Sequence, residues 1–192
     1  MSGQIKIGVL SGSMNADSMN LKLANYVVQR LVEDGGVETQ EINLLTLGLP
    51  VFSPELGLPD SVADLKDQMI SCDALVVASP EYNGSLTGAL KNAIDWASVP
   101  RDGDESLACF KGKACGLLAA SPGAMGGLQG LGHVRQILTR LQMHVVPTEF
   151  ALGKGHEAFD EAGNIKDDTS ARMAVNVGRE MIRVCRALSV AD

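Results

Sequence analysis

Two polar loops, each directly after a short apolar run, hold the residues best able to do chemistry. The run Ile5–Leu10 leads into hydroxyl and amide side chains that open a helix near Ser18, and a helix N-terminus offers free N–H groups and a partial positive charge that suit a phosphate. Between Lys6 and Lys22 there is no cation, and Asp17 adds a negative charge. A phosphate at this loop would therefore have to be held by neutral donors and the helix dipole. The candidate contacts are Ser11, Ser13, Asn15, Ser18, Met19 and Asn20. The plainer alternative is a strand-to-helix turn in which Ser and Asn only cap the helix.

The second loop, Ser79–Ser85, follows the apolar run Ala74–Ala78. A glycine in this loop permits a tight turn and close approach of the backbone to a ligand, and Tyr82 can flank a flat ring. The candidate ring contacts are Pro80, Glu81, Tyr82, Asn83 and Gly84. The alternative is a surface turn capped by Asn83. If the two loops meet in space, the ligand is a phosphorylated aromatic cofactor, and FMN is the first candidate.

A third loop, Ser121–Gly127, follows the run Ala114–Ala120 and has little side-chain bulk. Its backbone could lie against a planar ligand or a neighbouring chain, and the alternative is a flexible linker.

Several familiar catalytic patterns are missing from the sequence. No G-x-x-x-x-G-K-[ST] or G-x-S-x-G occurs, and Gly8 and Gly12 do not complete G-x-G-x-x-G. The three histidines have no acid–base partner nearby in sequence, and no metal-ligand spacing is present. We therefore expect no catalytic side chain and no metal, which fits a flavin that carries its own redox chemistry.

Bulk composition sets the class of protein. A chain of 192 residues with 45% hydrophobic residues predicts one domain over residues 1–192 with an ordinary core. The net charge of −7 argues against nucleic acid as a partner. No run approaches the ~20 apolar residues of a membrane span, no leader is evident, and the four cysteines lack a disulfide pattern, so we expect a cytoplasmic protein with reduced thiols and no membrane partner.

The elements that must position these loops alternate along the chain. Strands are expected at 4–11, 37–42, 74–78, 114–120 and around 145–146, and helices from Ser18, from Ser61, over 85–98, over 133–141 and along a stripe from Met173 to Leu188. Long loops are expected at 44–59 and 148–168. This alternation predicts a three-layer α/β/α sandwich around a five-stranded parallel sheet. In the order 2-1-3-4-5, the ends of strands one and three line the ligand crevice, which brings the first two loops together.

At these residues the chain resembles the NADPH-dependent FMN reductase family, a flavodoxin-like group that includes bacterial quinone, azo-dye and chromate reductases. The resemblance covers nearly the whole chain and is densest at 12–20, at 79–96 (SPEYNGSLTGALKNAIDW) and at 121–127. It implies FMN across the three loops, with phosphate contacts for Ser13, Ser18 and Asn20. The middle block would run under the isoalloxazine ring, and Ser121 and Gly123 would lie near its polar edge.

The chain departs from the family's phosphate loop, G-S-x-R-x-x-S-x-N, at two positions. Gly12, Ser13, Ser18 and Asn20 match, but the arginine is replaced by Asn15, and Asp17 stands where the family more usually has a small or basic residue. A lost charge-assisted contact weakens binding by roughly 1.5 to 3 kcal/mol, or about 10- to 100-fold. Flavodoxins hold this phosphate mostly with hydroxyls and amides, so the replacement bears on FMN affinity more than on fold.

The resemblance implies an NAD(P)H-dependent FMN-containing oxidoreductase. Hydride would pass from NADPH or NADH to FMN, and then to a quinone, azo compound, free flavin or oxidised metal ion, in a ping-pong cycle. It also implies a homodimer or homotetramer, with Trp96 and the helix before it at the contact. By its residue type alone, Trp96 could equally be a core residue. Two alternatives stay open: a flavodoxin-like electron carrier, and a family member with weakened FMN binding that acts as an interaction protein.

Overall fold

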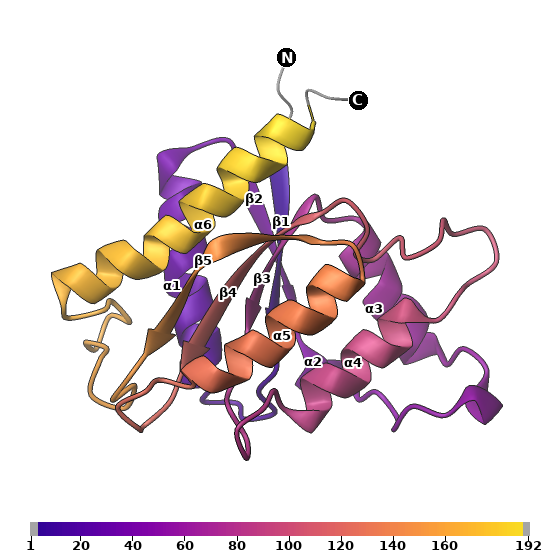
Figure 1. Cartoon of the computed structure of the whole chain (residues 1–192), viewed down its shortest axis with the longest axis horizontal. Coiled ribbons are helices and arrows are strands. Elements are labelled where there is room, and N and C mark those ends of the chain that lie inside the picture. Colours follow the sequence, from indigo (N-terminus) through magenta and orange to yellow (C-terminus); the bar gives the residue numbers. More distant parts are fainter. Residues whose placement is uncertain (1–3, 190–192) are drawn as a thin grey trace.

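The computed structural model describes residues 4–189, which form a five-stranded parallel sheet between two layers of helices (Figure 1). The strand order β2-β1-β3-β4-β5 confirms the predicted flavodoxin-like topology. The strands are β1 (Ile5–Ser11), β2 (Val37–Ile42), β3 (Ala74–Ala78), β4 (Ala114–Ala120) and β5 (His144–Leu152). The helices are α1 (Met19–Asp34), α2 (Leu44–Leu47), the 3-10 turn η1 (Pro54–Leu56), α3 (Asp60–Ile70), α4 (Gly88–Ser98), α5 (Leu128–Arg140) and α6 (Asp168–Leu188). The domain predicted over 1–192 reaches beyond the described residues at both ends.

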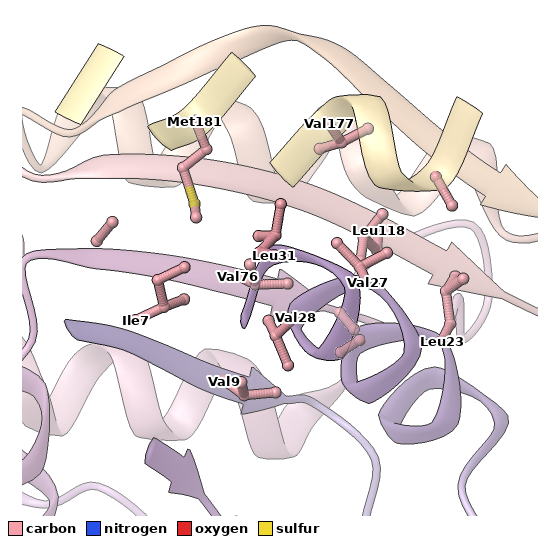
Figure 2. Close-up of a cluster of buried hydrophobic side chains, with 14 of the residues drawn as sticks. Ile7, Val9, Leu23, Val27, Val28, Leu31, Val76, Leu118, Val177 and Met181 are labelled. Atoms are coloured by element: carbon pink, nitrogen blue, oxygen red, sulfur yellow. The ribbon is translucent and has the colours of Figure 1, made fainter. Parts of the chain in front are cut away.

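Two hydrophobic clusters cover the two faces of the sheet. One joins the sheet to α1 and α6, and Figure 2 shows Val27 and Leu31 of α1 with Val177 and Met181 of α6 packed over strand residues such as Val76. The other joins the opposite face to α2, α3, α4 and α5. All five residues of β3 are buried, because a central parallel strand is covered on both faces. None of the helices within residues 4–189 is both long and apolar enough to cross a bilayer.

Two predicted helix starts near the loops are wrong. The helix expected from Ser85 begins at Gly88, because Ser85 closes a turn with Tyr82 and the Thr87 hydroxyl accepts from the Leu90 N–H as the N-cap. The helix expected from His133 begins at Leu128. Gly130 and Gly132 lie near its start and weaken the helical pattern of the sequence there.

The remaining differences concern β5, the connection between β2 and α3, and α6. The edge strand β5 runs on to Leu152, through a segment expected to be loop, since an edge strand tolerates Pro147. The connection 44–59 contains α2 and η1, and α3 begins at Asp60 with Pro59 as N-cap rather than at Ser61. On α6, Met173 is exposed and Ala174 takes the buried position.

Candidate functional site

The three loops begin side by side at the carboxyl ends of β1, β3 and β4. The Gly12 N–H donates to the Ala78 carbonyl at 2.8 Å, and the Ser79 N–H donates to the Leu118 carbonyl at 3.0 Å. Each bond links the first residue after one strand to a residue of the neighbouring strand. The prediction that these loops share one edge of the sheet is confirmed.

The first loop is held by a relay of side chains that accept from backbone N–H groups two or three residues ahead. Ser11 Oγ accepts from Ser13 N at 3.3 Å, Ser13 Oγ from Asn15 N at 3.2 Å, Asn15 Oδ1 from Asp17 N at 3.0 Å, and Ser18 Oγ from Leu21 N at 3.1 Å. Accepting these bonds leaves each serine its own O–H to donate. A hollow of about 30 Å³ between this loop and residues 41–45 is lined by Ser11, Ser13, Asn15 and Ser18. The loop therefore combines hydroxyl donors with a helix N-terminus.

The Asn20 side chain bonds to β4, whereas the other polar side chains of the first loop bond within the loop. Its side chain is buried, its Nδ2 donates to the Ala120 carbonyl at 2.8 Å, and its Oδ1 accepts from the Ala120 N–H at 2.8 Å. The amide thus fastens the start of α1 to the end of β4. The structure thus shows a structural partner for this side chain, and the phosphate contact that the motif implies for Asn20 stays a prediction.

The charge brought by Asp17 is balanced locally. Lys22 Nζ lies 2.5 Å from the Asp17 carboxylate, and both side chains are exposed. The same loop is clamped from α4, because Thr87 Oγ1 donates to the Gly12 carbonyl at 2.6 Å. A Cβ at Gly12 would lie 2.9 Å from the Leu90 Cβ, so only glycine permits this approach.

The second loop is a two-residue hairpin. Tyr82 and Ser85 exchange backbone hydrogen bonds of 2.9 and 3.1 Å, and the central Asn83 and Gly84 have φ of 53° and 76°. Two positive φ values define a type I′ turn, which Asn-Gly favours. In this turn the N–H groups of Asn83 and Gly84 are not used by the hairpin, and Tyr82 is 56% exposed. Two backbone donors and a phenol ring therefore stand together at the edge.

Helix α5 fixes this hairpin from the side. The Gly130 N–H donates to Glu81 Oε2 at 3.1 Å, and Ser85 Oγ lies 2.8 Å from His133 Nδ1. A Cβ at Gly130 would approach the Ser85 carbonyl oxygen at 3.1 Å. The sequence predicts Glu81 as a ring contact and finds no partner for His133, because the residue that each one bonds lies almost 50 positions away in the chain. The close-packed glycine Gly130 was the one local signal of this contact.

The third loop is packed and hydrogen-bonded, not a free linker. The Gly155 N–H donates to the Ser121 carbonyl at 2.9 Å, and the Lys154 N–H donates to the Gly123 carbonyl at 3.1 Å. A Cβ at Gly126 would lie 2.6 Å from the Ala151 carbonyl carbon. At Gly123 the nearest atom would be the Ser121 Oγ, at 3.6 Å. The backbone is thus fixed from behind by the segment after β5, with open space at Gly123.

Trp96 is a core residue. Its side chain is fully buried, its Nε1 donates to the Pro50 carbonyl at 2.8 Å, and its ring meets Phe52 edge-on at 4.8 Å. The expectation that Trp96 itself forms a subunit contact is wrong, because it offers no surface. It instead anchors the connection between β2 and α3.

The cysteines take no part in this edge of the sheet. All four are free and buried, and burial raises the pKa of the Cys115 thiol to about 12. Thiols of this kind are inert at neutral pH. Within residues 4–189, no group of three or more His, Cys, Asp or Glu side chains is placed to hold a metal ion.

The fold and the three loops at the carboxyl ends of its strands define a flavodoxin-like protein. Comparison with known proteins identifies the family. Residues 5–157 match the model of the NADPH-dependent FMN reductase family. The chain belongs to this family, as the sequence predicted, and so to the flavoprotein oxidoreductases that the family comprises.

Relatives and solved structures agree with this membership. An NAD(P)H-dependent FMN reductase of Pseudomonas aeruginosa is 33% identical over 177 residues, covering 90% of this chain and 91% of that protein. A quinone reductase of Pseudomonas putida is 29% identical over 184 residues, covering 93% and 94%. The structure of FerB, a flavoenzyme NAD(P)H:(acceptor) oxidoreductase from Paracoccus denitrificans, aligns with a TM-score of 0.80 at 30% identity, over 95% of this chain and 98% of that one.

Proposed function

We propose that this chain holds FMN across its three loops and oxidises NAD(P)H to reduce a small-molecule acceptor. The observation that carries the proposal is the meeting of a hydroxyl-lined helix N-terminus and an Asn83–Gly84 hairpin at adjacent strand ends. FMN, when bound, supplies reversible two-electron redox chemistry, so the protein need only bind and orient the reactants.

The first loop fits the phosphate. Ser11, Ser13 and Ser18 keep O–H groups to donate, and Asn15 keeps its amide N–H₂. Met19 and Asn20 lie in the first turn of α1, where backbone N–H groups have no partner within the helix. We assign Asn20 a backbone contact, since its side chain is committed to Ala120.

The second and third loops fit the ring. The N–H groups of Asn83 and Gly84 can donate to the polar edge of an isoalloxazine, where negative charge grows on reduction. Pro80 shapes the approach to the hairpin, Tyr82 flanks the ring, and Glu81 acts indirectly by holding α5 against the hairpin. From the third loop we assign contacts to Ser121 and Gly123.

Acceptor and donor would use the same exposed face in turn, which is a ping-pong cycle. The named relatives support quinones as one acceptor class, since they include quinone reductases of Pseudomonas putida and a 2-hydroxy-1,4-benzoquinone reductase of a Burkholderia species. Azo compounds, free flavin and oxidised metal ions remain part of the proposal. Parallel lines in double-reciprocal plots of rate against NADPH at several quinone concentrations would support the cycle, and intersecting lines would refute it.

The proposal includes a cytoplasmic homodimer or homotetramer acting as one domain over residues 1–192. A groove of about 770 Å³ between α4 and α5 supports a second copy as its occupant, because it combines the apolar Ile137 and Leu141 with the charges of Lys91, Asp95 and Arg140. Light scattering of the purified protein tests this, and a monomer at micromolar concentration would refute it.

The visible absorption spectrum of the fresh protein, repeated after FMN addition and desalting, tests the cofactor directly. A retained flavin spectrum together with NAD(P)H consumption supports an enzyme. A retained flavin without NAD(P)H consumption supports an electron carrier instead. A protein that stays colourless supports the interaction-protein alternative.

A further inference from the structure

The segment that follows β5 brings a cation to the third loop. The Lys154 N–H donates to the Gly123 carbonyl at 3.1 Å, and the next N–H, of Gly155, donates to the Ser121 carbonyl at 2.9 Å. A Cβ at Gly153 would fall 2.3 Å from the Ala124 carbonyl oxygen. The backbone of Lys154 is therefore fixed against the loop that we assign to the ring, and Figure 1 shows the segment after β5 beside the loop between β4 and α5.

Lys154 adopts a backbone conformation that lysine does not favour. Its φ is 50°, in the left-handed region where glycine and asparagine are more stable. The residue is exposed, and within residues 4–189 no hydrogen bond or ion pair engages its Nζ. The neighbouring His156 is already paired, with Nε2 3.1 Å from Glu157 Oε1. Packing and internal hydrogen bonding thus leave the Lys154 ammonium without a structural role.

The net charge of the protein indicates which kind of ligand the Lys154 ammonium would bind. The protein carries a net charge of −7, and a nicotinamide dinucleotide is also anionic, at its phosphates. Like charges slow the encounter of such a ligand with the protein unless a local cation offsets the field. At the first loop, Lys22 is already neutralised by Asp17.

We propose that Lys154 binds a phosphate group of the reduced nicotinamide dinucleotide while its nicotinamide lies against the flavin. The phosphate belongs either to the pyrophosphate or to the 2′-position of NADPH. This assignment rests on the proposed function and adds the residue that recognises the electron donor.

The test compares Lys154→Asn with Lys154→Arg and with Lys111→Asn, each reconstituted with FMN. Asparagine accepts a positive φ, so the first variant removes the charge without added strain. Lys111 is also exposed and lies before the amino end of β4, whereas Lys154 follows the carboxyl end of β5, so Lys111 serves as the control. Steady-state rates with NADPH and with NADH at saturating quinone, and the flavin content, are measured for each protein.

We expect Lys154→Asn to raise KM for the dinucleotide about three- to tenfold with kcat and flavin content unchanged, the range of an exposed charge-assisted contact. A rise for NADPH alone identifies the 2′-phosphate, and an equal rise for both donors identifies the pyrophosphate. The effect should shrink when ionic strength rises to about 0.3 M. Lys154→Arg should restore KM, and Lys111→Asn should leave it unchanged.

Three results would overturn the assignment: an unchanged KM for both donors, the same rise in the Lys111→Asn control, or loss of FMN from Lys154→Asn. The last would place the lysine on the flavin instead of on the electron donor. A wild-type protein that holds FMN but oxidises neither dinucleotide would instead refute the proposed function, and the Lys154 assignment with it.

Discussion

At the residue scale, Gly84 decides whether the hairpin can present its two N–H groups. Its φ is 76°, and an added Cβ would meet only Gln129 Oε1, at 3.9 Å. The space is open, so the barrier to a side chain there is backbone strain, on the order of 1 to 3 kcal/mol for a non-glycine residue.

We expect Gly84→Val to lose most of its FMN on desalting, because the β-branched residue distorts the turn. The flavin-to-protein absorbance ratio measures this. Gly88→Val is the matched control, since an added Cβ at Gly88 meets nothing within 4 Å and its φ is not positive. Full flavin content in Gly84→Val would show that the hairpin does not contact the ring.

Asn15 is the second residue on which binding depends. It lines the hollow beside Ser13 and Ser18, and its side-chain Oδ1 accepts from the Asp17 N–H. Asn15→Arg should tighten FMN binding by about 10- to 100-fold through a charge-assisted contact. Fluorescence titration of apoprotein gives the Kd, and the gain should shrink with added salt. An unchanged Kd would mean that the phosphate lies elsewhere.

At the element scale, the loop before β4 is tied to α3 by a small ionic network. Arg101 donates two hydrogen bonds of 2.9 Å to Asp104 and lies 2.7 Å from Asp67, and Lys66 Nζ is 3.7 Å from Asp104. The Arg101 guanidinium, chiefly through its hydrogen bonds, holds the pKa of Asp104 below its usual value. A folded-state pKa below the unfolded value stabilises the fold above the unfolded pKa, and this stabilisation is lost as the pH falls through the folded pKa.

Asp104→Asn should therefore lower the free energy of unfolding at pH 7 and flatten its decline below about pH 4. Urea unfolding at pH 7 and at acid pH measures both effects. Asp102→Asn is the control, because no ion pair within residues 4–189 involves Asp102. A pH dependence equal to that of the wild type would exclude this contribution.

The elements also show what a sequence can predict. The bounds of β2, β3 and β4 were correct, because β3 and β4 are continuous apolar runs and β2 alternates. The start of α5 was hidden by Gly130, whose absent side chain serves contact with Ser85 rather than the helix. The β5 extension was hidden by polar Thr148 and Glu149 on an edge strand. Links between distant residues, such as Glu81 to Gly130, leave no periodic signal.

At the scale of the whole molecule, the two hydrophobic clusters bury both faces of the sheet, and all four cysteine thiols lie within them. Desolvation raises the pKa values of Cys72, Cys109, Cys115 and Cys185. We expect no reaction of the native protein with a thiol reagent over minutes at pH 8, and four equivalents after unfolding in guanidinium. A rapidly reacting native thiol would reveal local opening of the core.

The amide of Asn20 has a consequence for how sequences of this kind are compared. Its one short side chain both donates to and accepts from Ala120. Aspartate can only accept, and glutamine is longer by a methylene. Selection for an intact fold would thus keep this asparagine even in a descendant that had ceased to bind any nucleotide. The asparagine that closes the phosphate motif is a marker of shared architecture, whereas Asn15, whose Oδ1 accepts only from the Asp17 N–H of its own loop, is the position where ligand preference can diverge.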